Sequence, residues 1–343
     1  MKSFKYLVVM FLCGFVLSCG SGVDIKKNDF VVKTNTKKGH ISNNKVLNLS
    51  IDNKKSHKID SVAFSTEGNK LNASTNLAAY KLGKHTIDAT VYSNGKAFNV
   101  NTNITVLSSK APKIYKYKLL NTYPHDITSY TQGLEFYKGH LYESTGLYKK
   151  SKLRQVNYKT GAVIKNVDLN DSYFGEGLTV LNNNIYQLTW ESGLGFVYDV
   201  TTLEKKNSFK YGKSKEGWGL CNNGKTIFKS DGTEKIWSLN TTSLTEDDHI
   251  EVYTNKGKII GINEMEWVNG SIYANRYQKD GVAIINPKNG TVDGVIDFSP
   301  LKKLVTQHDE LDVLNGIAYN PTTKTLFITG KLWDKLFEVQ ILD

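Results

Sequence analysis

The chain has few cysteines, and their positions exclude a disulfide-stabilised fold. Only three occur among 343 residues. Cys13 lies in an apolar N-terminal segment that we expect to be removed, and Cys19 stands at the end of that segment. Cys221 is therefore left without an intrachain partner. We interpret it as a small buried hydrophobic residue, which is the common role of a lone cysteine.

The patterns of several reaction classes are also missing. The sequence has no histidine pair at metal-binding spacing and no cysteine cluster, which argues against a zinc site. It has no Gly-x-Ser-x-Gly elbow for a hydrolase nucleophile and no glycine-rich phosphate loop between a strand and a helix. The acidic loop at 308–310 is interpreted as solvated. We expect neither a catalytic metal nor a cofactor.

Acidic residues are outnumbered, but only in one part of the chain. Asp and Glu total 33 against 44 Lys and Arg, which gives a net charge of +11. Residues 24–110 carry 14 Lys against 6 acidic residues, whereas residues 111–343 are nearly neutral. The basic part has few aromatic residues and no nucleic-acid motif. We interpret its lysines as a solvated surface and expect no nucleic-acid partner.

The N-terminus contains a short apolar run that resembles an export signal. Lys2 and Lys5 precede the apolar residues 6–16, and Leu17-Ser18-Cys19-Gly20 follows them. This order resembles a bacterial lipoprotein signal, in which residues 1–18 are cleaved and Cys19 is acylated. The run is too short to span a bilayer. We therefore expect an exported protein that a lipid on Cys19 anchors to a membrane, on the periplasmic or cell-surface face.

After a tether at 19–28, the pattern of residues 29–108 predicts a small all-β module. Alternation of apolar and polar residues is clearest at 86–92, and it resumes at 98–104 after Asn94-Gly95. Asn-Gly between two alternating runs indicates a hairpin. Such strands over about 80 residues favour an immunoglobulin-like β-sandwich with a spacer role. A linker is expected at 108–113.

Residues 113–343 contain five similar units. Each has an aligned start and further short strands; the starts are Gln132, Glu176, Trp218, Asn263 and Asn315. These positions are 44, 42, 45 and 52 residues apart. A period in the forties with about four short strands per unit is typical of a β-propeller. We predict five blades, with an early strand at 114–120 completing the last blade.

The aligned starts predict a ring of side chains around the propeller axis. This ring mixes amides, a carboxylate and an indole, as a ligand pocket would. A second set is expected near the same rim: Glu143, Trp190, Asn275, Tyr277 and Lys331. Trp190, Trp218 and Tyr277 would form an aromatic cage. A carboxylate in such a cage is suited to general acid–base catalysis.

Several long segments of 113–343 carry a specific resemblance: YTQGLEF (130–136), YESTGLY (142–148), SYFGEGLT (172–179), EGWGL (216–220), KSDGT (229–233), INEMEW (262–267), DVLNGIAY (312–319) and TGKLWDKLFEV (329–339). They resemble the glutaminyl-peptide cyclotransferases of the plant and bacterial type. The resemblance implies a five-bladed propeller that converts the N-terminal Gln of a peptide or protein to pyroglutamate and releases ammonia without a metal.

The resemblance also implies roles for single residues. Glu176 matches the family's catalytic carboxylate and Lys331 its channel lysine. Gln132 and Asn263 match polar residues that would hold the substrate, and Trp190 and Trp218 match aromatics that wall the pocket. Two positions depart from the common pattern: Tyr277 stands in place of Trp, and Tyr130 in place of Phe.

Two alternatives remain open from the residues alone. A propeller that binds peptides without catalysis would retain the blade motifs. A metal-dependent propeller hydrolase, similar to a lactonase, would hold its metal through Glu, Asn and Asp at the channel. For either reading, as for the cyclotransferase, we expect a monomer.

Overall fold

The structure is a computed structural model that describes residues 24–342. Strands make up nearly all of its regular elements, and two short helices accompany them, a 3₁₀ turn at Lys27–Asp29 and α1 at Ser299–Lys302. The predicted all-β class is confirmed. Neither helix of the described part is long and apolar enough to cross a membrane. The predicted signal at 1–18 and the acylated Cys19 lie outside the described residues.

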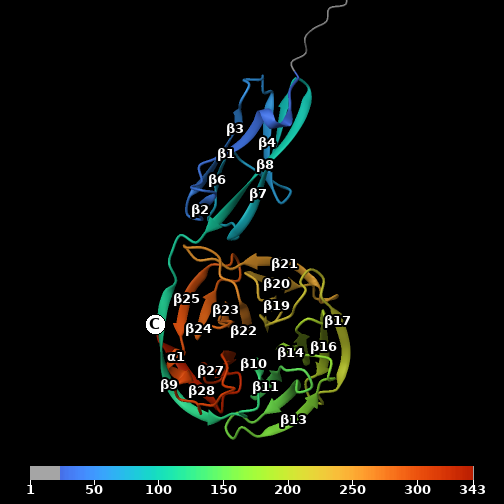
Figure 1. Ribbon diagram of the computed structural model, residues 1–343, viewed down its shortest axis with the longest axis vertical. Coiled ribbons are helices and arrows are strands. Elements are labelled where there is room, and N and C mark those ends of the chain that lie inside the picture. Colours follow the sequence, from blue (N-terminus) through green and yellow to red (C-terminus); the bar gives the residue numbers. More distant parts are fainter. Residues whose placement is uncertain (1–23, 343) are drawn as a thin grey trace, which may run out of the picture.

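The N-terminal body consists of two sheets that bury one shared core (Figure 1). A three-stranded sheet has the order β1-β3-β6 and a five-stranded sheet the order β2-β8-β7-β4-β5. Their bounds are β1 Phe30–Thr34, β2 His40–Ser42, β3 Val46–Asn53, β4 Ser61–Thr66, β5 Asn69–Leu71, β6 Ser74–Asn76, β7 Gly83–Ser93 and β8 Lys96–Leu107.

The predicted hairpin is present at the centre of this body. Strands β7 and β8 pair antiparallel up to Ser93 and Lys96. Asn94 and Gly95 both have positive φ, 49° and 73°. Two such residues form the turn whose twist matches that of the flanking strands. Residues alternate along β7 between buried and exposed, as one-sided packing requires.

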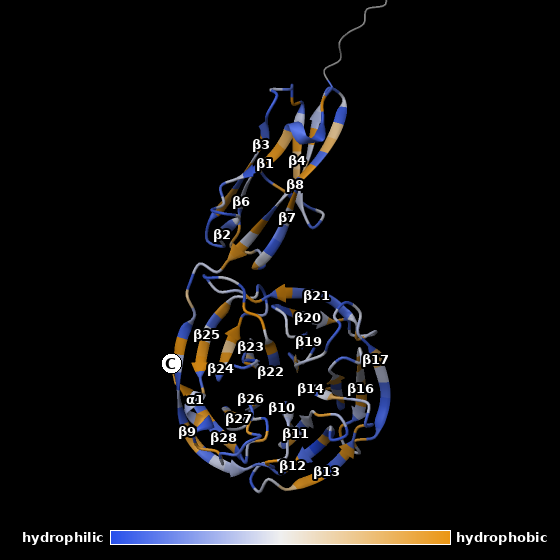
Figure 2. Cartoon of the chain, in the orientation of Figure 1, coloured by the Kyte–Doolittle hydropathy of each residue, from blue (hydrophilic) through white to orange (hydrophobic). Residues whose placement is uncertain are grey.

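The remainder of the chain forms a ring of sheets (Figure 1). Three are four-stranded antiparallel sheets in sequence order. Their strands are β10 Thr131–Tyr137, β11 His140–Thr145, β12 Lys152–Val156, β13 Val163–Asp168, β14 Gly175–Leu181, β15 Asn184–Thr189, β16 Leu194–Asp199, β17 Lys205–Lys210, β18 Leu220–Asn222, β19 Ile227–Ser230, β20 Lys235–Leu239 and β21 Glu246–Glu251. The outer strand β17 is mostly hydrophilic, and only Phe209 of it is buried (Figure 2).

An eight-stranded sheet closes the ring. Its order is β22-β23-β24-β25-β9-β28-β27-β26. The bounds are β9 Lys113–Pro124, β22 Ile262–Val268, β23 Ser271–Arg276, β24 Gly281–Ile285, β25 Val292–Asp297, β26 Leu314–Asn320, β27 Thr325–Gly330 and β28 Lys335–Leu342. The early strand β9 pairs antiparallel with β28, as expected, and its first residues also pair in parallel with β25.

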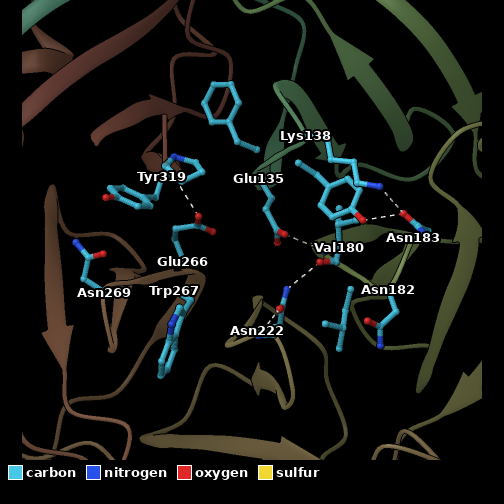
Figure 3. A pocket seen from close by; sticks show the side chains of 15 residues that line it. Glu135, Lys138, Val180, Asn182, Asn183, Asn222, Glu266, Trp267, Asn269 and Tyr319 are labelled. Carbon is cyan, nitrogen blue, oxygen red and sulfur yellow. Dashed lines mark hydrogen bonds between the residues drawn. The ribbon is translucent and has the colours of Figure 1, made fainter. Parts of the chain in front are cut away.

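Five inner strands lie around one axis. Strand β10 contacts β14 and β26, β14 contacts β18, and β22 contacts both β18 and β26. Buried glutamates near the middle of β22 join it to neighbouring inner strands. Glu264 accepts hydrogen bonds from the backbone N–H groups of Leu134 (3.2 Å) and Ile317 (3.0 Å). Glu266 accepts one from Tyr319 N–H at 3.0 Å (Figure 3). These carboxyl groups satisfy backbone donors that face the axis and have no strand partner there.

The N-terminal body contacts the ring directly as well as through the linker. Lys81 forms an ion pair with Asp248 at 2.5 Å, and the Lys84 backbone N–H donates to Glu251 at 3.0 Å. Tyr253, which follows β21, packs into the core of the N-terminal body. Cys221 is fully buried in the ring, as predicted, and forms no disulfide within residues 24–342.

Candidate active site

A cavity of about 290 Å³ lies at the end of the ring where the inner strands begin. Phe174 lines this cavity together with all eight side chains that were predicted for substrate binding and catalysis. These eight are Tyr130, Gln132, Glu176, Trp190, Trp218, Asn263, Tyr277 and Lys331. A second cavity of about 660 Å³ lies where the same strands end, and Glu135 and Glu266 line it (Figure 3).

β-bulges place the polar groups of the first cavity. The pairing register shifts by one residue around Gln132 in β10, around Glu176 in β14 and around Asn263 in β22. A fourth shift lies around Asn315 in β26. A bulge leaves a residue out of the ladder and redirects its side chain, and bulges are frequent beside active sites. In three of these strands the distortion turns equivalent residues, Gln132, Glu176 and Asn263, toward one cavity.

The glycines beside these residues allow the inner strands to lie close together. A Cβ on Gly133 would stand 2.4 Å from the backbone nitrogen of Leu178, and one on Gly219 would stand 2.1 Å from the carbonyl oxygen of Asn263. Any larger residue would push the sheets apart. The glycines that follow Gln132, Glu176 and Trp218 thus serve close backbone packing.

Glu176 is nearly fully buried at the floor of the cavity, 5% exposed. The amide nitrogen of Gln132 donates to its Oε1 at 2.9 Å. The Gln132 side-chain oxygen in turn accepts from Asn315 at 3.0 Å, which fixes the amide orientation. Burial raises the pKa of Glu176 well above the usual carboxyl value, and the positive charge of Lys331 opposes this rise.

Lys331 follows β27 and is 3% exposed. Its backbone N–H donates to the Val313 carbonyl at 2.9 Å. Its ammonium group lies 4.6 Å from the ring centre of Tyr130 and 5.5 Å from that of Tyr277. Burial lowers the pKa of Lys331, and the charges of Glu176 and Asp312 oppose this decrease. The cavity therefore holds a carboxyl group and an ammonium group. Burial raises the pKa of the first and lowers the pKa of the second, so the two values approach each other.

The aromatic walls are fixed by two carboxylates that sequence reasoning missed. Both indole N–H groups, of Trp190 and Trp218, donate to the same Oε2 of Glu216 at 2.8 Å. The Tyr130 hydroxyl donates to Asp312 at 2.8 Å. Glu216 and Asp312 stand in loops inside the quoted EGWGL and DVLNGIAY segments. A signal in the sequence could have identified them: Glu216 stands two residues before the pocket residue Trp218, and Asp312 stands two residues before β26.

Other aromatic contacts complete the wall. The rings of Trp218 and Tyr277 meet edge to face with centres 5.5 Å apart. Phe174 meets Trp190 in the same way at 5.6 Å. Phe174 lies in the SYFGEGLT segment quoted above, but no role was predicted for it. The predicted cage of Trp190, Trp218 and Tyr277 is thus extended by Phe174.

Three other residues of the expected sets do not line the cavity. Glu143 instead pairs with buried His125, Nε2 to Oε1 at 3.0 Å. Asn275 accepts from the backbone N–H of Gly316 at 3.2 Å. Asn315 supports Gln132 from behind. The ring of five aligned starts therefore supplies four cavity residues and one supporting residue.

Asn263 offers a ligand a polar atom at the cavity. It is buried, and its side-chain oxygen has no hydrogen-bond partner among residues 24–342. A buried polar group without a partner is costly, so such a group at a cavity marks a contact that substrate completes. Among residues 24–342, no group of three or more His, Cys, Asp and Glu side chains is placed to hold a metal ion.

Comparisons with known proteins identify the family of this chain. The model of the glutamine cyclotransferase family matches residues 84–341, so the match begins within β7 of the N-terminal body. A glutaminyl-peptide cyclotransferase of Arabidopsis thaliana is 40% identical over 233 residues, which is 67% of this chain and 72% of that protein. The crystal structure of Myxococcus xanthus glutaminyl cyclase superimposes with a TM-score of 0.63 at 35% identity, over 68% of this chain and all of that chain. This chain belongs to the glutamine cyclotransferase family.

Proposed function

We propose that the chain is a glutaminyl-peptide cyclotransferase, which converts the N-terminal Gln of peptides or proteins to pyroglutamate and releases ammonia. The observation that carries the proposal is that buried Glu176 and buried Lys331 line the same aromatic cavity. A cavity of about 290 Å³ suits one side chain with its terminal amine, not a folded partner.

The reaction forms a bond between the substrate α-amine and its own γ-amide carbon. Because closure is intramolecular, the protein's work is to hold the bent conformer and to move protons. Glu176 accepts a proton from the attacking amine. It then delivers a proton to the leaving nitrogen, so that ammonia departs as the carbon–nitrogen bond breaks. Lys331 stabilises the negative charge that develops on the amide oxygen in the tetrahedral intermediate.

The remaining side chains orient the substrate. The unpartnered Asn263 oxygen accepts an N–H from the substrate amine or amide. Gln132 holds the Glu176 carboxyl in place through the 2.9 Å hydrogen bond. Trp190, Trp218 and the tyrosine rings enclose the methylene groups and exclude water, which strengthens the charge interactions inside.

Trp190→Phe is expected to raise KM for a Gln-initiated peptide by about tenfold, with a smaller effect on kcat. Phenylalanine retains an aromatic face but loses the N–H bond to Glu216, and a hydrogen bond to a charged group contributes about 1.5–3 kcal/mol. Steady-state kinetics would measure this change. Trp267→Phe is the matched control, since Trp267 stacks on Phe228 and lines the opposite cavity. An unchanged KM in Trp190→Phe would contradict the role of Trp190.

We also propose the finer architecture and the location. The ring at 113–343 is interpreted as a five-bladed β-propeller, supported by the cyclic contacts of its five inner strands. Residues 29–108 are interpreted as an immunoglobulin-like sandwich, supported by two sheets around one core. Residues 1–18 would be a cleaved signal, and 19–28 a tether acylated at Cys19 that holds a monomeric, exported protein on a membrane.

The first experiment measures ammonia release and the matching mass loss from a Gln-initiated peptide. Purified protein that lacks residues 1–19 is assayed with and without a strong chelator. Turnover is expected at equal rates in both, because the proposed mechanism uses Glu176 and Lys331 alone. Loss of turnover with chelator would replace this mechanism with a metal-dependent one. No turnover in either condition would favour the peptide-binding alternative.

A further inference from the structure

A buried charged network lies next to the cavity, and the mechanism above does not use it. Its centre is His125, the residue that follows β9. The His125 side chain is 4% exposed. Its Nδ1 lies 2.7 Å from the Trp333 carbonyl oxygen, and its Nε2 lies 3.0 Å from the Glu143 carboxylate. A carbonyl and a carboxylate only accept hydrogen bonds, so both ring nitrogens must donate. With Glu143 ionised, this geometry requires an imidazolium.

The surrounding groups keep Glu143 ionised. Thr131 Oγ1 donates to Glu143 Oε1 at 2.8 Å. Arg154 donates to Ser129 Oγ at 2.9 Å and pairs with Asp126 at 2.8 Å. Burial would raise the pKa of Glu143, but the charges of His125 and Arg154 hold it below the usual carboxyl value.

The same environment retains the imidazole proton. Burial would lower the pKa of His125, but Glu143, the Trp333 carbonyl and Asp126 raise it above the usual imidazole value. The charged groups that face His125 are therefore Glu143 from β11 and Asp126 from its own loop. Arg154 from β12 acts on it through both of these carboxylates.

The network connects the turn that carries Lys331 with strand β10, whose Gln132 holds Glu176. On one side, the backbone N–H of His125 donates to the Asp334 carbonyl at 3.0 Å, and Leu332 N–H donates to the Ser129 carbonyl at 2.7 Å. Lys331 lies in the turn that these bonds hold. On the other side, Glu143 binds Thr131, the residue before Gln132, whose amide holds Glu176.

We propose that His125 is a positioning residue for the cyclisation. Its imidazolium fixes the turn that bears Lys331 against the strand that bears Gln132. This contact sets the distance between the Lys331 charge and the Glu176 carboxyl group. This proposal rests on the proposed function. It assigns no contact with substrate to His125. It predicts that a looser turn lets Lys331 move away, after which the pKa of Glu176 rises further.

The test uses His125→Gln, which can donate to one of the two acceptors but cannot reach both. We expect kcat to fall about tenfold and the acidic limb of the kcat profile to move to higher pH by about half a unit or more, because a charge that moves away in a dry site weakens its hold on a carboxyl. His140→Gln, an exposed histidine of β11, is the control and should match the wild type.

Two readouts do not depend on turnover. Nitrogen-15 NMR of the wild type at pH 7.5 should show two bound protons on the His125 ring. Carbon-13 titration should show a higher Glu176 pKa in His125→Gln than in the wild type. If that variant does not fold, Thr131→Val, which removes one donor to Glu143, should shift the Glu176 pKa in the same direction. A single ring proton, or an unchanged Glu176 titration in the folded variant, would overturn the proposal. An inactive wild type would refute only the cyclase function.

Discussion

Glu176→Gln is expected to lower kcat for a Gln-initiated peptide by about 10²–10⁴, the range that general acid–base groups contribute. The amide cannot accept the amine proton or return one to the leaving nitrogen. Its oxygen can still accept the 2.9 Å hydrogen bond from Gln132, so the cavity should retain its shape. Steady-state kinetics with mass detection of the cyclised product would measure the loss.

Stability and binding separate this effect from misfolding. Glu176 is buried with a raised pKa, so a neutral amide of the same size avoids the cost of a buried charge. The melting temperature should therefore be equal to that of the wild type or higher, and KM should change little. Glu191→Gln, an exposed glutamate beside Trp190, is the matched control and should retain full activity. A Glu176→Gln enzyme with more than a tenth of the wild-type kcat would refute the proposed role.

The sequence allowed the cavity residues to be predicted because their positions repeat. Gln132, Glu176, Trp218 and Asn263 open successive units, and equivalent positions on inner strands meet around an axis. The residues that hold the cavity side chains in place by hydrogen bonds could not be predicted from the repeat. Glu216 and Asp312 stand in loops outside the repeat, and their partners depend on how those loops cross the rim.

The bulges explain why the repeat did not predict the orientation of some polar side chains. Strand periodicity is two, so a one-residue slip reverses which face a side chain takes, and nothing in the local pattern marks the slip. The alignment placed Glu143 at the rim, whereas the structure turns it toward His125. Asn315 was expected to line the cavity, but its side chain donates a hydrogen bond to Gln132 instead. Both are polar side chains at strand positions where only the three-dimensional register decides the partner.

Lys331→Met is expected to lower kcat by about 10²–10³, the cost of removing one group that stabilises a developing oxyanion. Methionine fills a similar length without charge. The pH profile should change as well. The Lys331 charge holds the pKa of Glu176 down against burial, so its removal raises that pKa further. Glu176 then stays protonated to higher pH, and because the proton acceptor must be ionised, the acidic limb of the kcat profile moves to higher pH.

A charge-retaining variant separates the two roles of this lysine. Lys331→Arg retains the cation, so its acidic limb should stay close to that of the wild type, while the larger guanidinium in a cavity of about 290 Å³ should still lower kcat. Lys303→Met, an exposed lysine of the same ring, controls for the loss of one positive charge and should leave both quantities unchanged. If Lys331→Met and Lys331→Arg share one profile, the charge of Lys331 does not tune Glu176, and the lysine acts by filling space beside Tyr130 and Tyr277.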